Sequence, residues 1–406
     1  MGNDQRDPAG SLSSWPYAAA AYVFAVVMVG TTLPTPLYGL YQEEIGFSSL
    51  MITVIFAVYA AGVIAVLVVA GGVSDVLGRR PVLLAGLGCA AASALCFVFE
   101  GGLPLLFAGR VLSGFSAGLF TGTATVAVME LAPRHRRGRA SFAATAANML
   151  GLGCGPLLAG LLAEYAPSPL RLPYLVHLGL VVVACGLTLV LPETVRHSGP
   201  RPPLRPRTPS VPGEARAVFV PAALAAFAGF AMFGLFTSVA PSFMAEALGV
   251  HNLAVSGLVV FLTFAASTVG QASMGGVPAE RALPLGCFVL VAGLAGIGGS
   301  LLLSSLALLV AGAVVAGMGQ GLLFRAGLSA VSARAPADRR GETTSAFFVV
   351  AYLGISLPVV GVGALSLALG LRDAGLVFSA CAMVLAGSIG AWLLLRGTPD
   401  RPRPGA

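Results

Sequence analysis

The sequence predicts an all-α integral membrane protein whose twelve transmembrane helices form two pseudo-symmetric bundles of six. Three observations support this fold class: the composition, the number of long apolar runs and an internal repeat. Hydrophobic residues make up 57% of the 406 positions and charged residues only 10%. Ordinary soluble domains carry about 25% charged residues, so this composition excludes a soluble fold.

The chain contains twelve apolar runs separated by short polar segments. A helix needs roughly 20 apolar residues to cross a bilayer, and each run approaches or exceeds that length. The predicted spans are approximately residues 17–40, 52–71, 81–99, 103–128, 140–162, 174–191, 217–239, 253–274, 285–303, 306–331, 344–365 and 375–395. The lipid bilayer is therefore the expected environment of the chain.

The distribution of charge predicts how the spans are oriented. Arginines gather in every second polar turn and in the tail; they are Arg79, Arg80, Arg134, Arg136, Arg137, Arg139, Arg281, Arg334, Arg339, Arg340, Arg396, Arg401 and Arg403. The remaining turns carry Arg171 and Arg372 beside mostly acidic residues. Because cytoplasmic loops are enriched in basic residues, we expect both termini and the arginine-rich turns to be cytoplasmic in a multi-pass cell-membrane protein.

The net charge of +7 does not indicate a nucleic-acid partner. Nucleic-acid binding requires a clustered basic patch with accessible stacking aromatics, whereas these arginines are spread over short turns. The six cysteines lie inside apolar runs without metal-ligand spacing, and the four histidines are scattered. The sequence therefore predicts neither a metal site nor a bound cofactor.

A segment rich in proline and arginine divides the chain. Residues 192–216 contain almost nothing apolar, so they cannot form a core and are expected to be an extended cytoplasmic linker. The predicted units are a cytoplasmic tail over 1–14, a six-helix bundle over 15–191, a second bundle over 217–395 and a tail over 396–406.

The two halves repeat at a constant offset close to half the chain length. The aligned features are Gly114 with Gly317, Gly118 with Gly321, the turn 132–138 with 335–341, Gly151 with Gly354 and Gly160 with Gly363. Neither composition nor helix length forces matching turns at matching positions. Repeats of this kind relate two halves of a membrane protein by an axis along the membrane normal.

A charged turn between the second and third spans carries the most specific motif. It contains Gly72, Asp75, Gly78, Arg79 and Arg80. The turn resembles the loop between helices 2 and 3 of the major facilitator superfamily, G-x-L-A/S-D-R-x-G-R-R/K, with Val73 and Val76 as departures. The resemblance implies the major facilitator fold and a secondary transporter that moves a small-molecule substrate. The alternative is that the arginines serve only to orient the helices.

The resemblance also implies a role for the acid of this turn. In the superfamily it contacts neighbouring basic groups and the N-terminus of helix 11, which here is expected near Thr343 and Thr344. The positive end of that helix would favour a carboxylate. Glu130, at the end of the fourth span, is the expected partner of Arg79 or Arg139.

Arg110 lies well inside the fourth span. Its surroundings resemble the superfamily's helix-4 motif R-x-x-Q-G, with Ser113 in place of the glutamine, which implies a role in proton coupling or substrate binding. A guanidinium in the membrane should face a partner or a wet cavity; the alternative role is a structural bond to backbone carbonyls. Other candidate pore-lining residues are Asn148, Gln271, Gln320 and Tyr352, and Arg325 is either a cavity charge or reaches the headgroups.

The fifth span resembles the antiporter motif G-x-x-x-G-P-x-x-G-G. The matching positions are Gly151, Gly155, Pro156 and Gly160, with Ala159 at the penultimate glycine. Glycines permit close helix packing and the proline loosens one turn, so a hinge or a tight interface is expected. The match favours efflux over uptake, although an ordinary Gly/Pro-rich membrane helix would show the same residue types.

No Asp or Glu lies in the middle of a span. Transporters of lipophilic cations commonly bury a carboxylate, so this pattern favours a neutral or anionic substrate. A proton step would then fall to Asp75, Glu130 or His177. We expect a monomeric antiporter that exports a drug-like compound or metabolite and is driven by a proton gradient, with uptake or facilitated diffusion of a small metabolite as the alternative. A membrane enzyme or a receptor is disfavoured, because no catalytic constellation or additional soluble domain is present.

Overall fold

The computed structural model describes residues 14–99, 101–195, 208–274 and 277–396. These ranges contain twelve helices long and apolar enough to cross a membrane. The predicted all-α fold class is thereby confirmed. The predicted tails, apart from residues 14 and 396, and residues 196–207 of the predicted linker lie outside the described residues.

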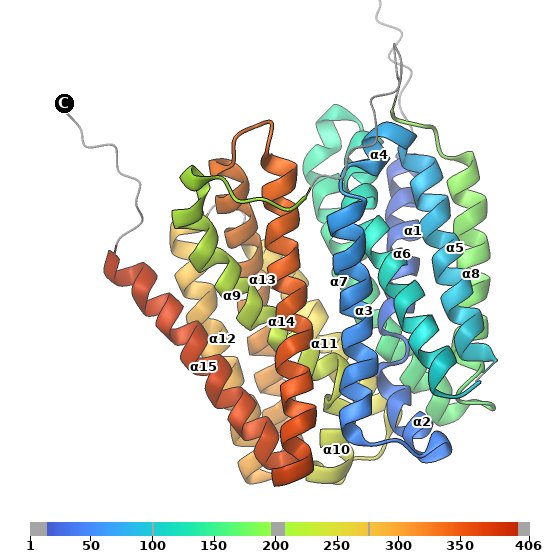
Figure 1. Cartoon of the computed structure of the whole chain (residues 1–406), viewed down its shortest axis with the longest axis vertical. Coiled ribbons are helices and arrows are strands. Elements are labelled where there is room, and N and C mark those ends of the chain that lie inside the picture. The colour runs from blue at the N-terminus through green and yellow to red at the C-terminus, as the bar shows by residue number, and fades with distance from the viewer. Residues whose placement is uncertain (1–13, 100, 196–207, 275–276, 397–406) are drawn as a thin grey trace, which may run out of the picture.

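The first half of the chain forms one bundle, seen on the right of Figure 1. Its elements are α1 (Trp15–Thr32), η1 (Thr35–Leu37), α2 (Tyr38–Ile45), α3 (Ser49–Val69), α4 (Val73–Leu77), α5 (Arg79–Val98), α6 (Leu103–Glu130), η2 (Arg134–Arg136), α7 (Arg137–Tyr165) and α8 (Leu172–Val190). We call this group of helices the first bundle.

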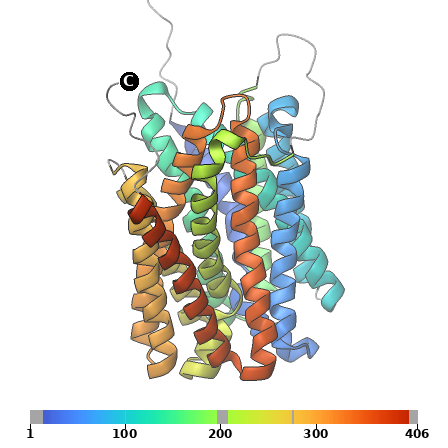
Figure 2. The ribbon, with the colours of Figure 1, turned by 60° about the vertical axis from the view of Figure 1, so that its left-hand side comes forward.

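The second half forms the second bundle beside it (Figure 1). Its elements are η3 (Gly213–Ala215), α9 (Arg216–Ser238), α10 (Ala240–Leu248), α11 (Leu253–Ser273), α12 (Ala279–Leu303), α13 (Leu306–Arg334), α14 (Arg340–Leu369) and α15 (Leu371–Arg396). Figure 2 shows most of the long helices lying nearly along one common axis, with α15 inclined to it.

The two ends of the bundles differ in charge. One end carries α4 and Arg79, and we call it the arginine end. The opposite end carries α2 and α10 with Glu43, Glu164 and Glu246, and we call it the acidic end (Figure 1). An even number of crossings returns the chain to the end from which it started, so α1 begins and α15 finishes at the arginine end.

The first predicted span is broken where two prolines fall. The sequence predicts one helix over 17–40, whereas α1 ends at Thr32 and a 3₁₀ turn containing Pro36 leads into α2, which ends at Ile45. Proline lacks the N–H that would continue a helix. The second bundle has the same break: α9 ends at Ser238 and α10 begins with Pro241 in its first turn.

The charged turn at the arginine end depends on two glycines with positive φ. Gly72 precedes the five-residue helix α4 at φ 90°, and Gly78 follows it at φ 102°. These backbone conformations are costly for residues with a Cβ atom. The turn therefore places Asp75 and Arg79 next to each other at the start of α5.

The two bundles pack together mainly through two helix pairs, α3 with α14 and α7 with α11. Close approach at the acidic end depends on glycines: a Cβ atom on Gly160 would meet the Leu253 carbonyl oxygen, and one on Gly257 would meet the Pro156 carbonyl oxygen. The Thr35 hydroxyl also donates to the Thr237 carbonyl at 2.9 Å. The bundles are thus in direct contact at the acidic end.

Candidate functional site

Arg110 of α6 is a buried cation, with 1% of its surface exposed. Its Nη1 donates to the Thr31 carbonyl of α1 at 2.7 Å. Its guanidinium carbon lies 4.7 Å from the centre of the Tyr59 ring and 5.5 Å from that of Phe56, both on α3. Aromatic faces attract a cation, most strongly where water is excluded.

These contacts leave part of the guanidinium unsatisfied. Arg110 Nε is buried and has no hydrogen-bond partner. Among the described residues, no Asp or Glu side chain is buried. The predicted structural bond to a backbone carbonyl is thus present, but it engages only one of the guanidinium nitrogens that could receive an anionic group.

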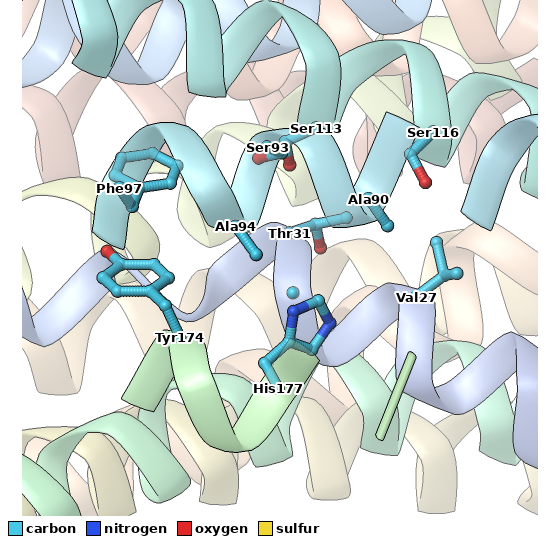
Figure 3. A pocket seen from close by; sticks show the side chains of 11 residues that line it. Val27, Thr31, Ala90, Ser93, Ala94, Phe97, Ser113, Ser116, Tyr174 and His177 are labelled. Carbon is cyan, nitrogen blue, oxygen red and sulfur yellow. The ribbon is translucent and has the colours of Figure 1, made fainter. Parts of the chain in front are cut away.

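Ser113, one turn beyond Arg110, lines a small cavity between α1, α5, α6 and α8 (Figure 3). Its hydroxyl is buried without a hydrogen-bond partner. The cavity offers about 10 Å³ to the centre of a water molecule, which corresponds to roughly one water. Ser93 and Thr31 also line it, so it is a polar pocket inside the first bundle.

His177 faces this cavity from α8 and is packed rather than free to move. Its Nε2 lies 3.1 Å from the Val26 carbonyl oxygen. Its ring also occupies the space that a Cβ atom on Gly30 would need. The close fit of His177 against α1 is consistent with a structural role.

Aromatic side chains join the two bundles between the ends of the long helices. The Tyr59 ring of α3 lies 6.4 Å from the Tyr352 ring of α14, measured between centroids. Tyr352 lies 6.1 Å from Phe230 of α9, which lies 5.3 Å from Phe324 of α13. The predicted pore-lining residue Tyr352 is thus in the contact between bundles.

Polar side chains gather in the second bundle. The Ser267 hydroxyl of α11 donates to Gln320 Oε1 of α13 at 2.6 Å, and Gln271 Nε2 donates to the Ser267 hydroxyl at 3.4 Å. Gln320 Nε2 is buried without a partner. Two predicted residues, Gln271 and Gln320, are therefore brought together, and one amide donor is left to bind another group.

Two other predicted residues stand apart from this polar group. Asn148 is partly buried on α7 next to Met149, whose sulfur lies 3.9 Å from the Ser267 hydroxyl across the two bundles. Arg325 is partly buried on α13, nearer to the arginine end than Gln320. Arg110 and Arg325 belong to different bundles.

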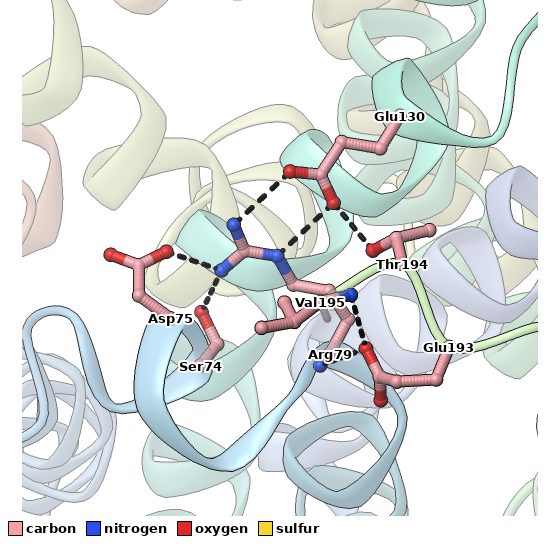
Figure 4. Close-up of polar contacts among 7 residues, drawn as sticks. All are labelled: Ser74, Asp75, Arg79, Glu130, Glu193, Thr194 and Val195. Atoms are coloured by element: carbon pink, nitrogen blue, oxygen red, sulfur yellow. Dashed lines mark hydrogen bonds and ion pairs between the residues drawn. The ribbon is translucent and has the colours of Figure 1, made fainter. Parts of the chain in front are cut away.

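A charge network occupies the arginine end (Figure 4). Arg79 Nη1 donates to Asp75 Oδ1 and to the Ser74 hydroxyl, each at 2.6 Å. On its other side, Nη2 and Nε donate to the two Glu130 carboxylate oxygens at 3.2 and 3.3 Å. Arg79 therefore lies between two carboxylates and links the α4 turn to the end of α6.

The predicted contact of Asp75 with the N-terminus of the eleventh span stays a prediction. Asp75 is paired with Arg79, and α14, the eleventh span, begins at Arg340, close to the predicted Thr343. Thr343 donates its hydroxyl to the Arg339 carbonyl within its own helix. The sequence did single out Glu130 as a partner of Arg79, and the two side chains are in contact.

Glu193 is a member of this network that the sequence analysis missed. Its carboxylate accepts hydrogen bonds from the backbone N–H groups of Arg79 and Arg80, both at 2.9 Å, and so caps the start of α5. The neighbouring Thr194 hydroxyl donates to Glu130 at 2.5 Å. The available signal was the Pro-Glu-Thr sequence directly after an apolar run, which composition alone assigned to the linker.

The environment of Glu193 keeps its carboxyl group ionised. Partial burial alone would raise the pKa of Glu193, but backbone N–H donors from Val195, Arg79 and Arg80 outweigh it and hold the pKa below its ordinary value. The cap is therefore present at neutral pH and is lost only as the pH falls through this lowered pKa. At the other end of the linker, the Ser210 hydroxyl donates to Glu342 in the first turn of α14.

Asp75→Asn tests the contribution of the network. The substitution removes one of the two charges paired with Arg79 but keeps a side-chain oxygen as acceptor. A partly exposed pair contributes about 0.5–1 kcal/mol, so we expect turnover to change about two- to fivefold while KM changes less. Transport kinetics of Asp75→Asn and of Asp373→Asn, an exposed aspartate at the acidic end, would measure this; equal turnover in both variants would refute the role of Asp75.

The glycine motif of α7 has two different packing partners. A Cβ atom on Gly151 would meet Ala25 and Met28, and one on Gly155 would meet Val29 and Thr32, all on α1. Gly160 instead faces Leu253 of α11 in the other bundle. The motif therefore supports packing within the first bundle at its start and contact between bundles at its end.

Pro156 frees a carbonyl group within this motif. A residue with an N–H at position 156 would donate to the carbonyl oxygen of Leu152, four positions earlier. The Thr32 hydroxyl of α1 donates to that oxygen instead, at 2.7 Å. This bond joins α1 to α7 at the turn that the proline loosens.

A hydrogen bond also crosses the bundles at the acidic end. Glu164 Oε2, at the end of α7, accepts from the backbone N–H of Leu253 at 2.9 Å, at the start of α11. Asn252 donates to the Tyr165 hydroxyl at 3.3 Å beside it. A cleft of about 800 Å³ opens here, lined by Glu43, Glu246 and His251 among others.

Glu164→Gln is expected to loosen the acidic end. The amide can still accept a hydrogen bond, but the favourable interaction of a negative charge with the positive start of α11 is lost, which is worth about 0.3–1 kcal/mol. The open population at this end should rise about two- to fivefold. Spin-label distances across the bundles would report it, with Glu44→Gln on α2 as the control; equal distributions for the two variants would contradict this interpretation.

Comparison with known proteins places these features in context. Residues 20–358 match the sequence family described as Major Facilitator Superfamily. The chain is 23% identical over 166 residues to the quinolone resistance protein NorA of Staphylococcus aureus strain N315, covering 41% of this chain and 42% of NorA. It is 26% identical to an uncharacterized MFS-type transporter of Methanocaldococcus jannaschii, covering 34% of this chain and 36% of that protein. The matched regions thus cover less than half the length of these relatives.

Solved structures share the fold over nearly the whole chain. A bacterial homologue of the human lysosomal transporter Spinster, in an inward-facing and occupied conformation, has a TM-score of 0.69 at 15% identity and covers 97% of this chain and 99% of its own. A POT family transporter in complex with a thioalcohol-conjugated peptide has a TM-score of 0.75 at 14% identity, with 95% and 96% covered. The human organic anion transporter MFSD10 has a TM-score of 0.64 at 18% identity, with 92% and 98% covered.

Proposed function

Because the chain belongs to the Major Facilitator Superfamily and is a secondary transporter rather than an enzyme, we propose that it exports a small neutral or anionic compound across the cell membrane in exchange for protons. In this proposal the arginine end and both termini are cytoplasmic, as the basic turns indicate. The protein acts as a monomer, since one chain supplies both bundles.

The environment of Arg110 is the observation that supports a neutral or anionic substrate. A buried guanidinium without a carboxylate partner attracts an anion or an acceptor-rich neutral group and repels a cation. Gln320 Nε2 in the second bundle is a further buried donor without a partner. No Asp or Glu is buried in the described part of the chain to attract a cationic substrate.

The contacts at the acidic end favour assignment of this conformation to the state that is closed on the outside. Thr35, Glu164 and Gly160 of the first bundle all contact the second bundle there. Substrate from the cytoplasm would then enter between the bundles from the arginine end. Rocking of the bundles would break the acidic-end contacts and expose the substrate to the outside.

Protons are proposed to act on the carboxylates of the arginine end. Protonation of Asp75 or Glu130 would weaken the bonds that hold Arg79 and release the α4 turn from α6. The direction of export is supported by the glycine-proline motif of α7 and by the partial similarity to NorA, a quinolone resistance protein.

Transport into inverted membrane vesicles tests this proposal. Norfloxacin, a fluorescent quinolone, and benzoate, a simple aromatic anion, are suitable probes. We expect uptake of an acceptable probe into vesicles that are acidic inside, and loss of uptake when nigericin collapses the pH gradient. Uptake that is unchanged by nigericin would exclude proton coupling, and accumulation only in right-side-out vesicles would exclude export.

A further inference from the structure

The Tyr59 ring contacts the buried cation and the opposite bundle at once. One contact is with the Arg110 guanidinium, at 4.7 Å, and the other is with the Tyr352 ring, at 6.4 Å. Tyr59 is 4% exposed. Water is therefore excluded from its ring, and the attraction between the ring and the guanidinium is not weakened by solvent.

The helices that carry these rings form one of the two main helix pairs that hold the bundles together. Tyr59 lies on α3 and Tyr352 on α14, and these two helices pack along each other. A Cβ atom on Gly363 of α14 would meet Thr53 of α3, so the pair is tightly packed toward the acidic end as well. Movement of Tyr59 would therefore change the packing of α3 against α14.

Binding of an anionic group would favour movement of the Arg110 guanidinium away from the Tyr59 ring. An anionic group would offer it stronger, charge-assisted hydrogen bonds than an aromatic face, and Nε is available for one of them. Arg110 is also anchored to α1 by the Thr31 carbonyl, so a change of partner would alter its position relative to α3.

We propose that Tyr59 is a positioning residue that couples the charge around Arg110 to the contact between the two bundles. While the guanidinium lies over the Tyr59 ring, that ring is held against Tyr352 and the bundles stay joined. When an anionic group binds Arg110, the guanidinium withdraws, Tyr59 loses its support and the contact with Tyr352 weakens. This inference rests on the proposed transport by alternating access. It identifies Tyr59 as the residue that links the charge of the substrate to the movement of the bundles.

A double-mutant cycle on the conformational equilibrium tests the relay without a substrate. Spin labels at Ser48 and Leu367, both exposed near the acidic end, would report the separation of α3 and α14 in the full chain, in nanodiscs and free of its six native cysteines. The ratio of long to short distances is then measured for Arg110→Gln, for Tyr352→Leu and for both together.

If Tyr59 connects these residues, the combined effect will differ from the product of the single effects by at least about threefold. In a Tyr59→Leu background the two effects should become multiplicative, whereas Tyr59→Phe, which keeps the ring, should retain the coupling. Tyr59→Met, which also lacks a ring, replaces Tyr59→Leu if the latter does not reach the membrane.

Multiplicative effects in the presence of Tyr59, or coupling that survives its replacement by Leu or Met, would overturn the inference. A different failure would be seen in the unsubstituted protein. There, the distance between the labels at Ser48 and Leu367 would stay the same at neutral and at mildly acidic pH, and in the presence of norfloxacin or of benzoate. That result would count against alternating access itself, so failure of the relay and failure of the proposed function are distinguishable.

Discussion

Arg110→Ala is expected to reduce transport at least about 100-fold, equivalent to ~3 kcal/mol, without preventing insertion into the membrane. The substitution removes the buried charge that we propose to bind the substrate, together with its bond to the Thr31 carbonyl and its contact with Tyr59. Insertion should persist because loss of a buried charge makes α6 more apolar. Initial rates of norfloxacin and benzoate uptake, normalised to the amount of protein in the membrane, are the measurement.

Two further variants separate charge from geometry. Arg110→Lys keeps the charge but loses the planar fork, so it should retain part of the activity with a raised KM. Ser113→Ala changes the neighbouring cavity but leaves the guanidinium in place, and its effect should be less than about tenfold. Transport at the unsubstituted rate in Arg110→Ala would remove Arg110 from the site.

Gly160→Val is expected to abolish transport by preventing closure of the acidic end. A side chain at this position meets the Leu253 carbonyl oxygen of the opposite bundle, and a backbone atom cannot move aside as a flexible side chain could. Overpacking of this kind costs about 1–3 kcal/mol, which the protein can avoid by keeping the bundles apart. We therefore expect an excess of the outward-open conformation and a folded but inactive protein.

The matched control for this variant is Gly179→Val on α8. Gly179 has no atoms within 4 Å of an added Cβ and is exposed on the surface of the bundle. It should transport at the normal rate, while Gly160→Val should show longer distances between labels at Ser48 and Leu367. Equal transport by the two variants would mean that close contact at Gly160 is not required in the transport cycle.

The number and order of the long helices could be predicted from the sequence because each apolar run must cross the membrane on its own. Proline and glycine then account for local departures. The first span was predicted as one helix, but Pro34 and Pro36 interrupt it and α2 continues to Ile45. Helix breaks of this kind can be predicted from the sequence because they depend on residues that are neighbours along the chain.

The candidate site was only partly predictable. The pairing of Arg79 with Glu130 could be anticipated, since both lie at the same end of neighbouring helices. The cap that Glu193 forms on α5 could not, because composition placed that residue in an unstructured linker. The aromatic cover of Arg110 by Tyr59 depends on how α3 and α6 rotate against each other, which periodicity in the sequence does not determine.

Residues far apart in the sequence meet only because the bundles pack together. Glu164 binds the backbone of Leu253, and Tyr59 meets Tyr352, across the two halves of the chain. Such pairs carry no local signal, and a single sequence contains no record of them. They are nevertheless the contacts that must break and reform if the bundles alternate.

The most direct test of alternating access is to join the bundles at the acidic end. Tyr165 and Asn252, whose side chains are 3.3 Å apart between the Tyr165 hydroxyl and the Asn252 amide nitrogen, are replaced by cysteines in a cysteine-free background and bridged with a short, reducible thiosulfonate cross-linker. If transport requires these helices to separate, the cross-linked protein will be inactive and reduction will restore the original rate. Transport at the original rate with the cross-link in place would contradict the account.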